Sequence, residues 1–395
     1  MNIAFIYFSA KVKQDTLGNL YNSGTYGSEF WQRYLQVADH ITLVMRKESV
    51  IYEPEEAQKR FNIIDTTKID FVELPDKFSS IKTFLNPSTR KKMKSTVFEQ
   101  LQKNDGAIIR LPGAEFAVKC ANKLNKPYLV EVVGCPFDSF WNHSLFGKIL
   151  AIPSMQKLKR ALKISKNAVY VTNKFLQKRY PTNGDSIGCS DVSIKNKEKI
   201  EALYDSKRKA NPKIILGTAG AIDVRYKGQQ YVIRALGELK KHGICNFEYQ
   251  IAGIGDSSYL KSQIIKYNVE DEVKIVGSIP HDQISEWYKN LDVYVQPSKT
   301  EGLPRSLVEA MNEGVASVGS NVGGIPELLD DESVFKKGNV KEICKILIKF
   351  SDETFRMKKA EKCYKKSLEY NCELLNKKRL DFMKSVFCDI RAQKE

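Results

Sequence analysis

Two glutamates flank a glycine–proline turn in the stretch Glu301-Gly-Leu-Pro-Arg-Ser-Leu-Val-Glu309. Pro304 suits the first position of a helix, because its fixed φ fits there and its missing N–H is not needed. Leu307 begins an inward apolar stripe, and Gly314 is placed to end the helix. We therefore predict a helix over Pro304–Glu313.

The first N–H groups of this helix point out of its N-terminus. Those of Arg305, Ser306 and Leu307 would hold a diphosphate, since a helix N-terminus attracts anions. Glu301 lies just before this helix mouth, and Glu309 lies more than one turn inside the helix. One carboxylate can then reach a sugar beside the phosphates, and the other can reach a nucleoside ribose.

The stretch resembles a known family pattern. Two acids at this spacing are common and also occur on ordinary surface helices, so the pair alone indicates little. Residues 301–329, EGLPRSLVEAMNEGVASVGSNVGGIPELL, resemble as a whole the E-x7-E element of family 4 retaining glycosyltransferases. The resemblance implies a nucleotide-sugar donor and the GT-B fold, in which two Rossmann-like domains face each other across a cleft.

Length and composition agree with a two-domain globular protein. A chain of 395 residues exceeds one ordinary core and favours two domains. The N-terminus MNIAFIYFSAKVK has no basic region and a short apolar run, so it indicates a first β-strand and not a signal peptide. No apolar run approaches the roughly 18–20 residues that cross a bilayer. We therefore expect a cytoplasmic protein.

Cysteines and net charge add two expectations. The eight cysteines are scattered with no CxxC pair, which favours reduced thiols over disulfides or a zinc site. The net charge of +16 favours an anionic partner. That partner could be a nucleotide phosphate, a nucleic acid or an acidic membrane surface, and charge alone leaves all three open.

Short β-branched runs alternate with helical patterns almost throughout, which is typical of parallel α/β sheets. Two such series follow one another and predict two Rossmann-like domains. We predict an N-terminal acceptor-binding domain over 1–190, a linker over 191–212 and a nucleotide-sugar-binding domain over 213–372. A helical segment over 373–395 completes the chain, and the resemblance implies that it crosses back to the first domain.

Ligands of open α/β sheets bind at the carboxyl ends of the strands. After the strand near Lys213–Leu216, Gly220 permits close backbone approach, and Lys227 can act as a point charge on a diphosphate. Lys227 matches the lysine of the family's Lys-Gly pair, although it could also be a solvated residue at a helix start. The family's arginine is replaced by Ala221, which leaves Arg225 as its candidate substitute. The backbone of Ser278 and Ile279 matches the base-contacting region.

The first domain is expected to present the acceptor side of the cleft. Gly27 belongs to a segment that resembles the family's glycine loop, and several polar residues near strand ends are further candidates: Arg110, Glu131, Asp138 and His143. Many family members carry a histidine after the strand that ends near Val133. This chain has Gly134 and Cys135 there, so the histidine is missing. Asp138 or His143 could cover part of its role, or could instead be structural or face the acceptor.

The expected chemistry follows from charge. Breaking the bond between the anomeric carbon and a diphosphate separates an oxocarbenium-like sugar from an anionic nucleotide. Lys227 and the helix mouth would stabilise the nucleotide, and Glu301 would orient the donor sugar. With no carboxylate nucleophile in the pattern, we expect same-face attack with retention. We expect neither a metal nor a cofactor.

The segment Phe146–Lys166 contains six basic residues and no acidic ones. Its apolar residues make it a basic amphipathic segment, which indicates a membrane-surface contact or an ordinary helix with a solvated basic face. The residues that we assign to an anionic membrane surface are Lys157, Lys159, Arg160 and Lys163. A lipid-linked acceptor would agree with the membrane interpretation.

We predict a retaining glycosyltransferase that elongates a bacterial surface polysaccharide at the inner face of the cell membrane. A phosphorylase or a nucleotide-sugar epimerase with the same fold is the first alternative. A basic nucleic-acid-binding protein is the second, although the sequence contains no RNP-like aromatic motif, helix-turn-helix or zinc module in its support.

Overall fold

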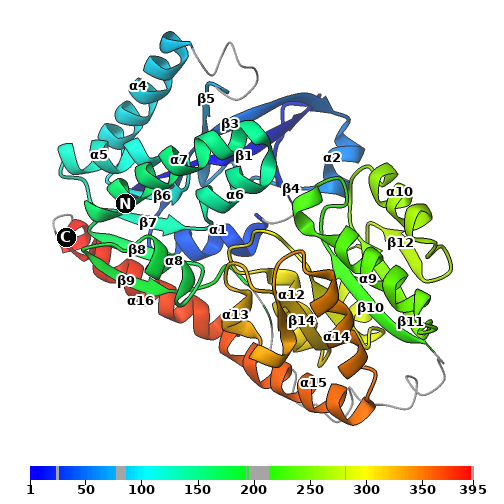
Figure 1. Cartoon of the computed structure of the whole chain (residues 1–395). Coiled ribbons are helices and arrows are strands. Elements are labelled where there is room, and N and C mark those ends of the chain that lie inside the picture. The colour runs from blue at the N-terminus through cyan, green and yellow to red at the C-terminus, as the bar shows by residue number, and fades with distance from the viewer. Residues whose placement is uncertain (24–25, 77–85, 193, 195–212, 281, 393–395) are drawn as a thin grey trace.

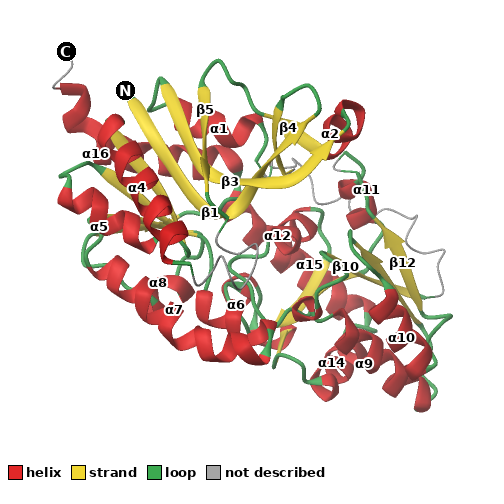
Figure 2. Cartoon of the chain, turned by 90° about the horizontal axis from the view of Figure 1, so that it is seen from above, coloured by secondary structure: helices red, strands yellow, loops and turns green. Residues whose placement is uncertain are grey.

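Two parallel β-sheets, one after the other along the chain, form two domains (Figure 1). The computed structural model describes residues 1–23, 26–76, 86–192, 194, 213–280 and 282–392. We call the part built on the first sheet the N-domain and the part built on the second the C-domain. Figure 2 separates the two sheets, with β1, β3 and β5 in one domain and β10 and β12 in the other. The predicted α/β class with two Rossmann-like domains is confirmed.

The N-domain sheet has a parallel body in the order β5-β3-β1-β6-β7-β8-β9, and β2 and β4 extend it in antiparallel pairing beside the end of β1. Its strands are β1 (Asn2–Asp15), β2 (Leu20–Ser23), β3 (His40–Tyr52), β4 (Phe61–Ile63), β5 (Ile69–Leu74), β6 (Gly106–Leu111), β7 (Tyr128–Val132), β8 (Asn167–Tyr170) and β9 (Asp185–Gly188).

Helices cover both faces of this sheet because successive side chains of a strand point to opposite faces. Ile3 and Phe5 of β1 face a layer that includes α1 and α16, whereas Ala4 and Ile6 face α4, α5 and α7. The N-domain helices are α1 (Ser28–Leu35), α2 (Pro54–Arg60), α4 (Pro87–Lys103), α5 (Glu115–Lys123), α6 (Pro136–His143), α7 (Leu145–Lys163) and α8 (Phe175–Arg179).

The C-domain sheet is parallel throughout, in the order β12-β11-β10-β13-β14-β15. Its strands are β10 (Ile214–Ala219), β11 (Phe247–Ala252), β12 (Val273–Gly277), β13 (Val293–Gln296), β14 (Ala316–Ser320) and β15 (Val334–Phe335). The other elements are η3 (Arg225–Lys227), α9 (Gln229–Lys241), α10 (Ser258–Tyr267), α11 (Ile284–Lys289), α12 (Arg305–Asn312), α13 (Ile325–Leu328), η4 (Asp331–Ser333), α14 (Val340–Lys349), α15 (Glu353–Ser367), η5 (Leu368–Tyr370) and α16 (Cys372–Ala392).

The predicted and observed elements differ mostly at the polar ends of strands. The sequence predicts a strand near Ile3–Phe8, but β1 continues to Asp15 and pairs with β2 at Lys13 and Gln14. Polar residues alternate there, so the strand lacks the apolar run by which strands were predicted. Pro304 is the N-cap of α12 with ψ of 113°, so its predicted place as the first helical residue is corrected by one position. Gly314, with φ of +70°, ends that helix as predicted.

Helix α16 crosses from the C-domain to the N-domain (Figure 1). Its first turn lies beside the end of the N-domain chain, where the Cys372 N–H donates to the Ile194 carbonyl at 2.8 Å and Ile194 forms a parallel bridge with Asn371. Its later residues Met383 and Phe387 pack in the core that also contains Ile3 and Phe5 of β1, and Phe387 lies against Gly106 of β6. Most of the predicted linker, residues 193 and 195–212, lies outside the described residues. Each of the eight cysteines is a free thiol.

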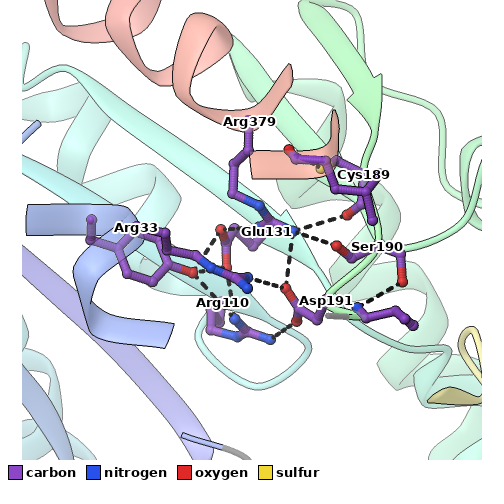
Figure 3. Close-up of polar contacts among 10 residues, drawn as sticks. Arg33, Arg110, Glu131, Cys189, Ser190, Asp191 and Arg379 are labelled. Atoms are coloured by element: carbon purple, nitrogen blue, oxygen red, sulfur yellow. Dashed lines mark hydrogen bonds and ion pairs between the residues drawn. The ribbon is translucent and has the colours of Figure 1, made fainter. Parts of the chain in front are cut away.

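A buried ionic cluster attaches α16 to the N-domain (Figure 3). Arg379 contacts Glu131 at 2.7 Å and Asp191 at 3.0 Å, and it also donates to the carbonyls of Cys189 and Ser190. Arg110 joins the same two carboxylates at 2.9 and 2.6 Å. Burial raises the pKa of Asp191, but the neighbouring arginines outweigh burial and hold that pKa well below its ordinary value. The Asp191 carboxylate is therefore ionised at neutral pH.

Candidate active site

A cavity of about 430 Å³ lies at the carboxyl ends of the C-domain strands. It gathers residues from four places in the sequence: the end of β10, η3, α11, and the segment that leads into and begins α12. They come together because the carboxyl ends of parallel strands share one edge of a sheet. We call it the donor cavity, and it is lined by Ala219, Gly220, Ala221, Lys227, Ile284, Tyr288, Glu301, Leu303, Pro304, Arg305, Ser306 and Glu309.

The side chain of Glu301 is held by three donors that converge on Oε1. Ser298 Oγ lies at 2.7 Å, Lys227 Nζ at 2.8 Å and Gln296 Nε2 at 3.1 Å. Burial lowers the pKa of Lys227, but the Glu301 carboxylate outweighs burial and holds that pKa above its ordinary value. The site therefore contains a charged lysine, and among the described residues its ion-pair partner is Glu301.

Helix α12 presents its N-terminus to the same cavity, because Pro304 sets its start and the buried side of the helix anchors it. Arg305 and Ser306 line the cavity, whereas the side chain of Leu307 is fully buried in the core. Ser306 Oγ lies 2.9 Å from the Tyr294 hydroxyl. The side of the first turn that faces the cavity therefore combines partial positive charge with a hydroxyl group.

Glu309 projects from the second turn of α12 and accepts a hydrogen bond from the Tyr288 hydroxyl at 3.1 Å. Burial raises the pKa of Tyr288, and Tyr294 and Glu309 raise it further, so this phenol stays protonated and donates. Both carboxylates of the E-x7-E element thus line one cavity, each held in place by neighbouring side chains.

The sequence interpretation missed the residues that hold these carboxylates. Gln296 is the last residue of β13 and Ser298 lies two residues beyond it, so their place at the carboxyl end of a parallel strand was a usable signal. Tyr288 and Tyr294 carried no comparable signal, because buried tyrosines occur throughout both domains.

Three predicted donor residues lie apart from the described lining of the donor cavity. The Arg225 guanidinium lies over the Tyr259 ring, 4.2 Å from its centroid. Ser278 and Ile279 directly follow β12, with Ser278 exposed. Their roles with phosphates and base stay predictions.

Two of the predicted acceptor residues are placed differently from our expectation. Arg110 and Glu131 are only 3% and 1% exposed, and they form the ionic cluster with Arg379 and Asp191 (Figure 3). Both lie next to the last residues of the expected strands, β6 and β7, but their charged groups pair inside the domain. We correct them from cleft-facing residues to residues that fix α16.

The other N-domain candidates lie nearer the surface. Gly27 is the N-cap of α1, and His143 is the exposed last residue of α6. Asp138 pairs with Arg179 at 2.8 Å and lines a second cavity of about 470 Å³ between the two domains. Across that cavity, Glu327 accepts hydrogen bonds from the backbone N–H groups of Asn173, Lys174 and Phe175 at 2.7, 3.1 and 2.6 Å. These bonds connect the domains directly.

The predicted membrane-contact residues lie on α7. Lys157, Arg160 and Lys163 are exposed, and Lys159 is half-buried. Beside them the structure reveals an exposed apolar patch, consisting of Trp141, Leu145, Phe146, Ile149 and Ile152. Leu145 is 81% exposed and Ile149 is 70% exposed. In the described ranges, no helix combines the length and the apolar character that crossing a bilayer requires.

The comparisons with known proteins agree with this geometry. The family described as "Glycosyl transferases group 1" matches residues 199–369. Protein CapJ of Staphylococcus aureus is 34% identical over 334 residues, which cover 83% of this chain and 81% of CapJ. The amylovoran biosynthesis glycosyltransferase AmsK of Erwinia amylovora is 36% identical over 135 residues, covering 32% of this chain and 33% of AmsK.

Solved structures share the whole architecture. Alr3699/HepE of Anabaena, in complex with UDP-glucose, superposes with a TM-score of 0.65 at 15% identity and covers 98% of this chain and 100% of that protein. Likeness at this identity concerns the fold, which is the GT-B arrangement of two Rossmann-like domains. Together with the match of the C-domain and the relative that spans most of the chain, it shows that this chain belongs to the group 1 glycosyltransferases of family 4.

Proposed function

We propose that this enzyme transfers a sugar, with retention of anomeric configuration, from a nucleotide-diphosphate sugar to a saccharide acceptor in bacterial surface polysaccharide synthesis. The main support is the donor cavity, where Lys227, Glu301, Glu309 and the N-terminus of α12 meet. Amylovoran synthesis by AmsK supports the polysaccharide assignment, and the bound UDP-glucose of Alr3699/HepE supports the donor class.

The proposed reaction breaks the bond between the anomeric carbon and the donor's diphosphate oxygen. Lys227 and the first N–H groups of α12 stabilise the negative charge that develops on the nucleotide. The acceptor hydroxyl attacks from the face that the nucleotide leaves, and its proton passes to the departing phosphate oxygen. Glu301 orients the donor sugar, while Glu309 holds the ribose.

In the free enzyme Lys227 is neutralised by Glu301 at 2.8 Å. A diphosphate that enters the cavity competes for this lysine, so donor binding would release Glu301 toward the sugar. The site thus couples occupation by the nucleotide to the orientation of its catalytic carboxylate.

The direct test uses a panel of UDP- and GDP-sugars. A rise in the thermal unfolding temperature measures donor binding, and release of free nucleotide measures turnover. A transferase frees nucleotide only when donor and acceptor are both present. Phosphate-dependent formation of a sugar 1-phosphate would indicate a phosphorylase instead. A change in the donor sugar without any acceptor would indicate an epimerase.

Glu309→Ala is expected to weaken UDP binding about 10- to 100-fold, because one hydrogen bond to a charged group contributes about 1.5–3 kcal/mol. Isothermal titration calorimetry with UDP measures this loss, and affinity for pyrophosphate stays within about twofold. Glu286→Gln, on the exposed face of the neighbouring helix α11, serves as the control. Unchanged UDP affinity in Glu309→Ala would remove the ribose assignment.

The proposed acceptor is lipid-linked, and the proposed location is the inner face of the cell membrane. Support comes from α7, whose basic residues lie beside the exposed apolar patch. A surface that pairs lysines with exposed apolar side chains suits an anionic bilayer, since each basic residue near such a surface contributes about 1 kcal/mol.

Flotation with vesicles that contain phosphatidylglycerol is expected to carry the wild-type protein, whereas pure phosphatidylcholine vesicles carry at least tenfold less. Reversing three charges on α7, Lys157→Glu, Lys159→Glu and Arg160→Glu, is expected to lower the bound fraction at least tenfold. The matched control reverses three exposed lysines on α14 of the C-domain, Lys341, Lys345 and Lys349. Equal flotation of the two triple variants would contradict a specific α7 surface.

A further inference from the structure

The second cavity lies between the domains, and its charged side chains have no role in the proposed transfer reaction. It has a volume of about 470 Å³, and both domains line it. We call it the basic pocket. Its lining consists of Asp138, Lys174, Phe175, Lys178, Arg179, Asn321, Val322, Gly323, Pro326, Glu327 and Lys337.

The charges of the basic pocket are unbalanced. Four cationic side chains face two carboxylates, which leaves a net charge of +2 (four minus two). Both carboxylates already have partners: Asp138 pairs with Arg179, and Glu327 accepts three backbone hydrogen bonds. Within the described part of the chain, no carboxylate forms an ion pair with Lys174, Lys178 or Lys337. Three ammonium groups are thus available to an anion.

The basic pocket adjoins the donor cavity through the backbone of Glu301. Gly323 lines the basic pocket and packs so closely that an added Cβ would lie 2.3 Å from the Glu301 carbonyl oxygen. The Glu301 side chain lines the donor cavity on its other side. Asn142 of α6 also reaches across, donating to the Lys299 carbonyl at 3.2 Å. A ligand group in the basic pocket therefore lies next to the site of transfer.

On its outer side, the pocket continues into the apolar patch. The Arg179 guanidinium lies 4.8 Å from the centre of the Phe137 ring, and that ring stacks on Trp141 at 5.3 Å with an interplanar angle of 16°. Trp141 is the first residue of the patch, which continues along α7 through Leu145 and Ile149. Positive charge and apolar surface are thus contiguous, in the order that an anionic head and a lipid tail require.

We infer that the basic pocket binds the phosphate or diphosphate that joins the acceptor saccharide to its lipid. Lys174, Lys178 and Lys337 neutralise the phosphate, while the patch receives the start of the lipid chain. This inference rests on the proposed function, and it names the acceptor as a phosphate ester of a lipid alcohol. A purely saccharide acceptor would leave the three lysines without a role.

The test uses the full-length protein with saturating UDP, so that the donor cavity is occupied. Farnesyl diphosphate is the probe; methyl diphosphate has the same head group without the lipid, and farnesol has the lipid without the phosphates. Titration calorimetry is expected to show at least tenfold tighter binding of farnesyl diphosphate than of either control. The double variant Lys174→Glu, Lys178→Glu is expected to weaken its binding at least tenfold.

A matched pair of single variants localises the effect. Lys337→Glu alters the basic pocket, whereas Lys336→Glu alters an exposed neighbour outside its lining. The first is expected to weaken farnesyl diphosphate binding at least fivefold, and the second leaves it within twofold. Wild-type affinity in the double variant would overturn the inference. Equal affinity for methyl and farnesyl diphosphate would overturn its lipid part.

UDP affinity, measured first in the same samples, separates this inference from the proposed function. A wild-type protein that binds farnesyl diphosphate but no nucleotide would contradict the proposed function and support the pocket. A protein that binds UDP normally, with farnesyl diphosphate affinity insensitive to Lys174, Lys178 and Lys337, would contradict the pocket alone.

Discussion

Glu301→Gln is expected to lower the rate of sugar transfer by about 100-fold or more while UDP binding is retained. The amide has nearly the same shape, but it removes the negative charge that Lys227, Ser298 and Gln296 hold in place. Loss of orientation at the reacting carbon costs about two orders of magnitude even for small displacements. Steady-state turnover with the best donor of the panel measures the effect.

The same substitution is expected to tighten UDP binding by about two- to tenfold. In the enzyme without donor, Lys227 forms an ion pair with Glu301 at 2.8 Å. The neutral amide of Glu301→Gln cannot form this ion pair, so the lysine is available to the diphosphate. Glu238→Gln, on α9 outside the donor cavity, is the control for a lost surface charge. Full transfer activity in Glu301→Gln would reduce Glu301 to a structural residue, and a parallel loss of UDP affinity would assign it to nucleotide binding.

Arg379→Met is expected to destabilise the protein by about 3–5 kcal/mol, which is typical of removing one partner from a buried ionic cluster. The substitution removes one of the positive charges beside the Glu131 carboxylate. It also removes the hydrogen-bond donor of the Cys189 and Ser190 carbonyls. Thermal unfolding is expected to shift downward by on the order of 10 °C.

Lys378→Met is the matched control, since it removes an exposed charge from the adjacent position of α16. It is expected to change the unfolding temperature by at most about 1–2 °C. A second substitution, Glu131→Gln, is expected to recover part of the stability that Arg379→Met loses, because it removes the carboxylate left underpaired. Equal unfolding temperatures for Arg379→Met and Lys378→Met would contradict a stabilising cluster.

Much of the architecture follows from local patterns. The sequence predicts a strand over Val293–Gln296 and a helix over Gln229–Lys241, and β13 and α9 have these bounds. Buried parallel strands and amphipathic helices have strong periodic signals. The strands β2 and β9 were missed, since each has four residues and neither is an uninterrupted apolar run.

The donor cavity was predictable to a similar degree. Gly220, Lys227, Glu301 and Glu309 share it because strand ends converge at one edge of a parallel sheet. Arg110 and Glu131 also lie near the carboxyl ends of strands, yet their charged groups are buried inside the domain. Their partner Arg379 lies 248 residues from Glu131 along the chain, and no local pattern indicates such a pairing.

The contact between Ile194 and the first turn of α16 has a mechanical consequence. The polypeptide passes between the domains twice, once after Ile194 and once before Cys372, and a hydrogen bond of 2.8 Å joins the two passages at that point. Two chain connections that are joined at one point allow the domains to rotate about that point but oppose their separation. The domains would then open and close by rotation about this one point. Each closure would return the residues that line the donor cavity and the basic pocket to the same relative positions.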